Sequence, residues 1–182
     1  NLAPGTGLSH VLDLLSSGDS MHALVRSCAK GASGGTGTTE VVTLDMNGKI
    51  KGRFAVGIKP TCTVNDLVSS GAYGALRMAL LASGDIAVTG VNYEGDGAYR
   101  VQRYTPAGQL RWSVDLPNID SYARAYALGA AGDEVWVAGA LASQDSTTLG
   151  FKISYTDVDA GALFAFGIDA SGALAHHVHV TQ

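Results

Sequence analysis

One pattern of turns recurs three times along this chain, and this repetition constrains the fold more than any other feature. The first turn of each unit is a Gly-Asp pair, found at Gly18-Asp19, Gly84-Asp85 and Gly132-Asp133. The second turn ends in glycine, at Gly48, Gly108 and Gly172. Each copy of a repeat is one supersecondary unit that buries its faces against its neighbours, so the pattern predicts stacked, similar units.

Composition agrees with a globular, turn-rich chain. The 182 residues are 46% hydrophobic and 15% charged, which suits one domain with a sizeable core. The 24 glycines supply the positive φ angles that tight turns need. A net charge of -4 argues against nucleic acid as a partner. No apolar run approaches the ~20 residues that cross a bilayer, so we expect no membrane span.

Short apolar or alternating runs lie between the turns, which is typical of strands. Four are expected in each unit, at residues 11–15, 21–27, 41–44 and 50–56, then 75–81, 86–91, 99–104 and 110–116, then 122–128, 135–139, 163–168 and 173–180. Four strands joined by hairpin turns match one propeller blade. We therefore predict an all-β, single propeller-like domain over residues 1–182, with three four-stranded antiparallel blades at about 8–59, 73–117 and 121–182.

Two segments leave a helical alternative open. Residues 8–15 and 64–81 can each be drawn as a helix from their apolar spacing. Gly71 and Gly74 lie inside the second segment and weaken its helical interpretation, because glycine is a poor helix former.

The middle unit resembles the short repeats of bacterial beta-propeller proteins of the exported type. The resemblance rests on residues 84–90 (Gly-Asp-Ile-Ala-Val-Thr-Gly) and on 103–112, from Arg103 through Pro106-Ala107-Gly108 to Trp112. Residues 132–139 repeat the first half, whereas His176 and Gly52 stand where the other units would carry the tryptophan. The resemblance implies a blade architecture and a binding scaffold, and its motifs describe turns and packing, not chemistry.

Three blades are too few for a typical ring, which closes with four to eight. Open apolar sheet faces do not stay exposed, so further blades must cover them. They could come from other chains or from more of this sequence, two copies could form a six-bladed ring, or an open arc could pack on a larger partner.

Cys28 and Cys62 are the two cysteines of the chain, and they form one candidate disulfide. A bridge between them would close a loop and so stabilise the fold by roughly 3–4 kcal/mol in the chain-entropy model. Two buried thiols acting as small hydrophobes are the alternative. The even cysteine count and high glycine content favour a secreted, cell-surface or periplasmic protein.

Two groups of residues are candidates for ligand binding. Arg100 and Arg103 lie on the middle blade with aromatic neighbours, where they could bind an acidic or carbohydrate partner. Arg77, Tyr122 and Arg124 lie on the predicted innermost strands and could line a central channel. Ordinary cross-strand packing and neutralisation of nearby carboxylates are the alternatives.

A metal site has one histidine candidate. His177 and His179 would point to the same face of a strand and could share a transition-metal ion, although no third ligand is identifiable. Residues 92–97 echo half of a calcium loop, but Arg103 stands where the bidentate glutamate belongs. An exposed terminal strand and an ordinary connection are the respective alternatives, so we expect no resident cofactor.

The sequence therefore predicts a non-catalytic binding or structural module that assembles with further blades or copies through protein partners or self-association. The alternative is part of an exported enzyme, glycan-active or metal-dependent, with its site at the propeller channel. No catalytic residues can be assigned from the sequence.

Overall fold

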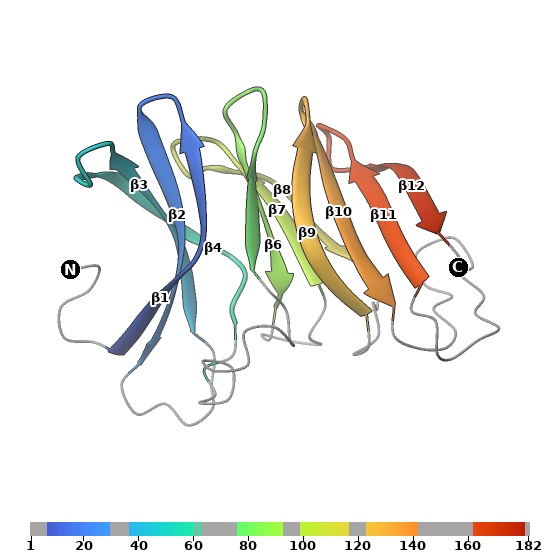
Figure 1. Ribbon diagram of the computed structural model, residues 1–182, viewed down its shortest axis with the longest axis horizontal. Coiled ribbons are helices and arrows are strands. Elements are labelled where there is room, and N and C mark those ends of the chain that lie inside the picture. Colours follow the sequence, from blue (N-terminus) through green and yellow to red (C-terminus); the bar gives the residue numbers. More distant parts are fainter. Residues whose placement is uncertain are drawn as a thin grey trace.

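A computed structural model describes residues 7–29, 37–60, 62, 76–92, 99–116, 123–141 and 162–180. In these residues the chain is all β, and the prediction of three four-stranded antiparallel sheets is confirmed. The sheets follow one another across the molecule, as Figure 1 shows. They do not close on one another within this part of the chain.

Each sheet is an up-and-down meander of consecutive strands. The first sheet contains β1 (Gly7–Ser17), β2 (Ser20–Ala29), β3 (Thr38–Asp45) and β4 (Ile50–Val56). The middle sheet contains β5 (Arg77–Leu80), β6 (Ile86–Val91), β7 (Tyr99–Tyr104) and β8 (Leu110–Leu116). The third sheet contains β9 (Ala123–Ala131), β10 (Glu134–Leu141), β11 (Ala162–Ile168) and β12 (Leu174–Val180).

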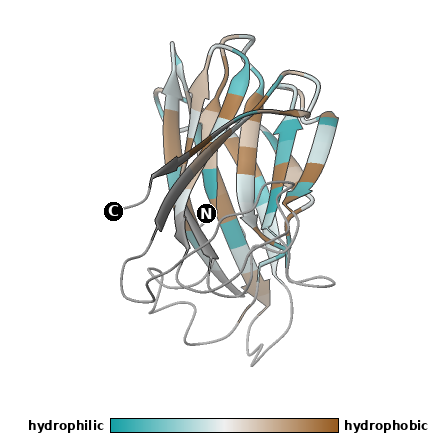
Figure 2. Ribbon diagram, turned by 90° about the vertical axis from the view of Figure 1, so that its right-hand side faces the viewer, coloured by the Kyte–Doolittle hydropathy of each residue, from teal (hydrophilic) through white to brown (hydrophobic). Residues whose placement is uncertain are grey.

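The helical alternative does not hold where the structure describes the two segments. Residues 8–15 belong to β1, and Arg77–Leu80 forms β5. Apolar and polar bands alternate along the strands in Figure 2, as expected when side chains point to the two faces of a sheet in turn. The tertiary burial of one face therefore decides the conformation of these short apolar runs.

Two apolar clusters hold the sheets together. Leu24 and Val41 of the first sheet pack with Ile86 and Val88 of the middle sheet. On the other side of the middle sheet, a second cluster joins it to the third sheet. Its fully buried members are Ala87, Val101, Val135, Val137, Phe166 and Ile168. Among the described residues, the middle sheet thus packs on a neighbouring sheet at both faces and each end sheet at one.

The innermost strands of neighbouring sheets contact each other, β1 with β5 and β5 with β9. A bulge between Val11 and Asp13 turns Asp13 toward the middle sheet, where its Oδ2 accepts a hydrogen bond from the Met78 N–H at 3.0 Å. A carboxylate from β1 thereby satisfies a backbone donor of β5, which would otherwise be left without a strand partner.

The second turns are alike in all three sheets. The N–H of Asp45, Thr105 and Asp169 donates to the carbonyl of the residue four positions later, and the turn glycine then has a positive φ. The first turns differ in length. Ser17 pairs with Ser20 and Ala131 with Glu134 across two residues, whereas the middle turn is longer, with the Leu81 N–H donating to the Asp85 carbonyl.

Candidate functional site

The longer middle turn builds an ion-pair cluster between the middle and third sheets. Asp85 is only 1% exposed, and its Oδ2 accepts hydrogen bonds from Arg103 Nε and from Arg111 Nε, both at 2.8 Å. Arg103 continues to the third sheet, where its Nη1 donates to the Asp133 carbonyl at 3.1 Å. Because the buried carboxylate and guanidinium neutralise each other and link two sheets, this cluster is structural.

The other side of the cluster is closed by the turn of the third sheet. The Ser83 N–H donates to Asp133 Oδ1 at 3.0 Å, and the Ala82 N–H donates to the Gly132 carbonyl at 2.9 Å. Hydrogen bonds from the hydroxyl and backbone N–H of Ser83 hold the pKa of Asp133 below its ordinary value. Asp133 is therefore ionised at neutral pH and complements Arg103.

Arg100 and Arg103 do not form one surface, because they lie on opposite faces of β7. Arg100 makes a two-pronged ion pair with Asp115 of β8, with Nη2 donating to Oδ2 at 2.7 Å. The hydrogen bond from Arg100 also lowers the pKa of Asp115. The neighbouring Tyr99 and Tyr104 are buried in the two different apolar clusters. Arg100, Arg103 and Arg111 of the middle sheet thus neutralise carboxylates within the described fold.

The proposed channel residues are only partly visible. Arg77 begins β5, and its Nη1 donates to the Leu76 carbonyl at 3.0 Å. Arg124 lies in β9, paired with Ala140, but its side chain falls outside the described part of the structure. Tyr122 lies outside the described residues altogether. The structure therefore places Arg77 and Arg124 on innermost strands.

The histidine candidates lie on the last strand of the third sheet. Register pairs His177 with Phe166 and His179 with Phe164, and both histidine side chains fall outside the described part. The calcium-like residues 93–97 also lie outside it, whereas Asn92 accepts a hydrogen bond from the Lys59 N–H through its Oδ1 at 3.0 Å. Among the residues that the structure describes, no three His, Cys, Asp or Glu side chains are grouped as for a metal ion.

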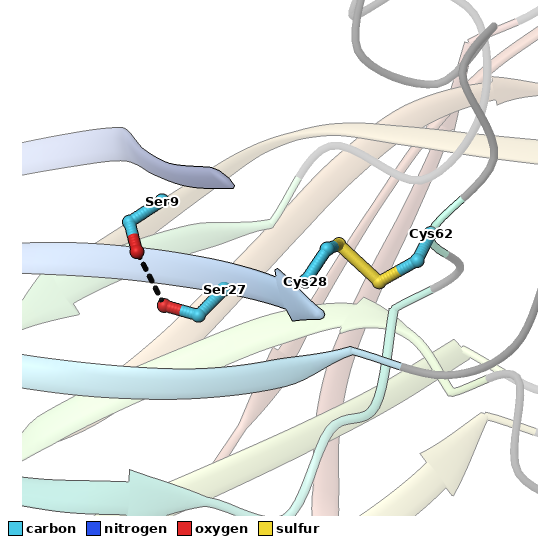
Figure 3. The surroundings of a disulfide bond; sticks show 4 residues. All are labelled: Ser9, Ser27, Cys28 and Cys62. Carbon is cyan, nitrogen blue, oxygen red and sulfur yellow. Dashed lines mark hydrogen bonds between the residues drawn. A yellow bond between two sulfur atoms is a disulfide. The ribbon is translucent and has the colours of Figure 1, made fainter. Parts of the chain in front are cut away.

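Cys28 and Cys62 are joined in a disulfide, with their Cα atoms 5.7 Å apart, instead of forming two separate thiols (Figure 3). The bond ties the end of β2 to the connection that leaves the first sheet. Gly37 lies directly against it, since an added Cβ would come within 2.7 Å of Cys62 Sγ. Beside it, the hydroxyls of Ser9 and Ser27 are hydrogen-bonded at 2.9 Å.

The outer face of the first sheet is an apolar surface turned away from the middle sheet. Ala23, Val25 and Val42 form a small cluster on this face with Leu44, and each of the three is at most 3% exposed. In the described part of the chain, every member of this cluster comes from the first sheet. On β1, Val11 and Leu14 extend this surface, and each is 55% exposed.

The outer face of the third sheet has a different character. Trp136 of β10 stacks on the His176 ring of β12, with centroids 6.0 Å apart and planes within 2°. His176 Nε2 is 3.6 Å from Glu134 Oε1, a buried oxygen that accepts no hydrogen bond from the described residues. Gly167 lies beneath Glu134 and Trp136 and leaves no room for a Cβ. Val178 continues this face and is 50% exposed.

Sequence reasoning did not identify these two faces as sites. Glu134 and Trp136 lie two residues apart on β10, but His176 is distant in the chain, and its place beside them requires the pairing register of β10, β11 and β12. The one available signal was the substitution of His176 for the tryptophan of the middle unit. Register supports that alignment, because Trp112 pairs with Arg103 as His176 pairs with Gly167.

No model of a known protein family matches this chain, and no curated protein matches it. The described residues contain no helix long and apolar enough to cross a membrane. Function is therefore argued from the geometry of the sheets.

Proposed function

We propose that this chain is a non-catalytic structural or binding module whose two outer faces bind further sheets of the same kind. In this proposal the sheets are blades of a propeller-like assembly, and the additional sheets come from further blades or copies. The repeats that resemble those of exported bacterial proteins support the idea, and so does the disulfide, since disulfides persist in oxidising compartments. We accordingly place the protein outside the cytoplasm.

One observation carries the proposal: strand register shows which residues occupy equivalent positions in the three sheets. Ile86 pairs with Tyr104 and Val135 with Ile168, and each pair is buried against the preceding sheet. The corresponding pair of the first sheet is Met21 with Leu44.

Met21 and Leu44 therefore lie on the face of the first sheet that corresponds to the buried faces of the other two sheets. The equivalent faces of the other two sheets are already interfaces, and Val11 and Leu14 are the exposed apolar side chains on this face of β1. An exposed patch of this kind marks a protein interaction site.

The test is the mass of the protein in solution, measured by light scattering or sedimentation as a function of concentration. We expect wild type to associate and Leu14→Asp to weaken association at least about tenfold, because a carboxylate would be buried without a partner. Leu110→Asp is the matched control, since Leu110 is similarly exposed but lies on the middle sheet. A wild type that is monomeric at every concentration would contradict the proposal.

A further inference from the structure

The two interfaces between neighbouring sheets share a feature at the end where the second turns lie. The second turn of one sheet covers an aromatic side chain on the fourth strand of the sheet before it. Gly108 of the middle sheet lies against Phe54 of β4 so closely that an added Cβ would overlap the ring. Gly172 of the third sheet lies on Trp112 of β8, where an added Cβ would be 3.0 Å from the indole. Trp112 Nε1 also donates to the Ala170 carbonyl at 3.1 Å.

Among the described residues, the second turn of the first sheet covers no aromatic side chain. Gly48 is the equivalent glycine of the first sheet, and no atom lies within 4 Å of its hypothetical Cβ. Met46, which corresponds to Ala170 by the turn hydrogen bonds, is 62% exposed. This turn would therefore present an exposed methionine and a glycine without neighbouring atoms to an aromatic surface.

The matching aromatic surface is at the other end of the same chain. His176 corresponds to Trp112 by register, and it stacks with Trp136 on the outer face of the third sheet. The buried Glu134 Oε1 there lies 3.6 Å from His176 Nε2 and accepts no hydrogen bond from the described residues, so it keeps its capacity to accept one. The first sheet thus has the covering turn, and the third sheet has the surface to be covered.

We propose that these two outer faces bind each other between two copies of the chain. The turn of residues 45–49 of one copy covers the Trp136–His176 stack of its partner, and the exposed Val11 and Leu14 of its β1 pack against the partner's third sheet. This inference rests on the proposed function and names its partner: a second copy, joined through unlike faces.

Two copies related in this way form a closed dimer with two identical joints. Unlike faces generate a ring when the rotation closes and a filament when it does not. The sheets are in contact through their innermost strands and fan outward in Figure 1, so the stack is curved. Three sheets per copy give six in the dimer, within the four to eight blades of closed rings.

The experiment is site-directed cross-linking between two variants of the full chain that each carry one added cysteine. Asn47→Cys lies in the exposed turn of the first sheet, and His176→Cys lies on the outer face of the third. We expect mild oxidation of the mixed variants to join them into a dimer. Ala107→Cys is the matched control, because Ala107 is the equivalent turn residue of the middle sheet, whose turn already covers Phe54.

The outcomes separate this inference from the proposed function. A cross-link between Asn47→Cys and His176→Cys, with the wild-type mass converging on that of two chains, supports both. Two other outcomes overturn the closed dimer of unlike faces: a cross-link between two copies of Asn47→Cys, or a mass that keeps growing with concentration. Both leave the proposed function standing, because the chain still associates. A wild type that never associates overturns both. Because His176→Cys removes part of the stack, Ala175→Cys on the neighbouring exposed position serves as a second acceptor.

Discussion

Asp85 shows how one residue can hold two sheets together. Its carboxylate is almost fully buried, yet it accepts hydrogen bonds from two guanidinium groups, and Arg103 extends the link to Asp133. A buried charge is tolerated only when it is paired and hydrogen-bonded, so each member of the cluster depends on the others. The same Gly-Asp dipeptide at Gly18-Asp19 lies in an exposed turn.

We predict that Asp85→Asn lowers the free energy of unfolding by about 3 kcal/mol, because it removes the buried carboxylate that pairs with Arg103 and leaves that guanidinium only the more distant, exposed Asp133. Asp19→Asn changes the same dipeptide in the exposed turn and should alter stability by no more than about 0.5 kcal/mol. Chemical denaturation of both variants measures the difference. Equal losses for the two variants would show that the dipeptide matters for its turn and not for the ion pair.

A second pair of residues tests the cost of an unsatisfied hydroxyl. Thr39 and Thr89 are both 1% exposed, but Thr39 Oγ1 has no hydrogen-bond partner among the described residues, whereas Thr89 Oγ1 donates to the Arg100 carbonyl at 3.1 Å. Valine has nearly the same shape as threonine. We predict that Thr39→Val raises the free energy of unfolding by about 1 kcal/mol and that Thr89→Val lowers it by about 1 kcal/mol.

Urea denaturation of the two variants beside wild type checks this pair of signs. A loss of stability in Thr39→Val would mean that its hydroxyl is satisfied in solution, for example by water.

At the scale of strands and turns, the sequence was sufficient for the elements but not for their faces. Period-2 alternation and the recurring turn glycines predicted the three four-stranded sheets, because each of these signals is local. The Gly-Asp motif, however, suggested that Asp19, Asp85 and Asp133 are equivalent, and the structure shows that Asp85 is not. The longer turn of the middle sheet moves Asp85 to the start of β6, where its register equivalents are Ser20 and Glu134 rather than Asp19 and Asp133.

Bulges are the second reason why the site could not be predicted from the sequence. A register shift precedes the second turn in every sheet, at Thr43/Leu44, Arg103/Tyr104 and Gly167/Ile168. A shift of one residue moves every following side chain to the other face. Arg100 and Arg103 lie three residues apart on β7, so ordinary alternation already places them on opposite faces. Trp136 and His176, in contrast, come together only through the register of β10, β11 and β12.

At the scale of the whole molecule, the three sheets differ in how many faces they bury. The middle sheet has Ile86 and Val88 against the first sheet and Ala87 and Val101 against the third, all without exposed surface. Among the described residues, each end sheet packs on one neighbouring sheet. Since local stability follows the burial of apolar contacts, the end sheets should open more readily than the middle sheet.

This difference gives a concentration-dependent prediction for backbone hydrogen exchange. At low protein concentration, amides of β6 and β7 should exchange most slowly, and those of β2, β3, β10 and β11 faster. Raising the concentration should slow exchange in the end sheets, because association covers their outer faces, while β6 and β7 stay nearly unchanged. Mass spectrometry of peptides from the three sheets measures this directly. Leu14→Asp should abolish the concentration effect in both end sheets, since each joint of the proposed dimer uses one outer face of each kind. Loss of the effect in the first sheet alone would contradict that pairing.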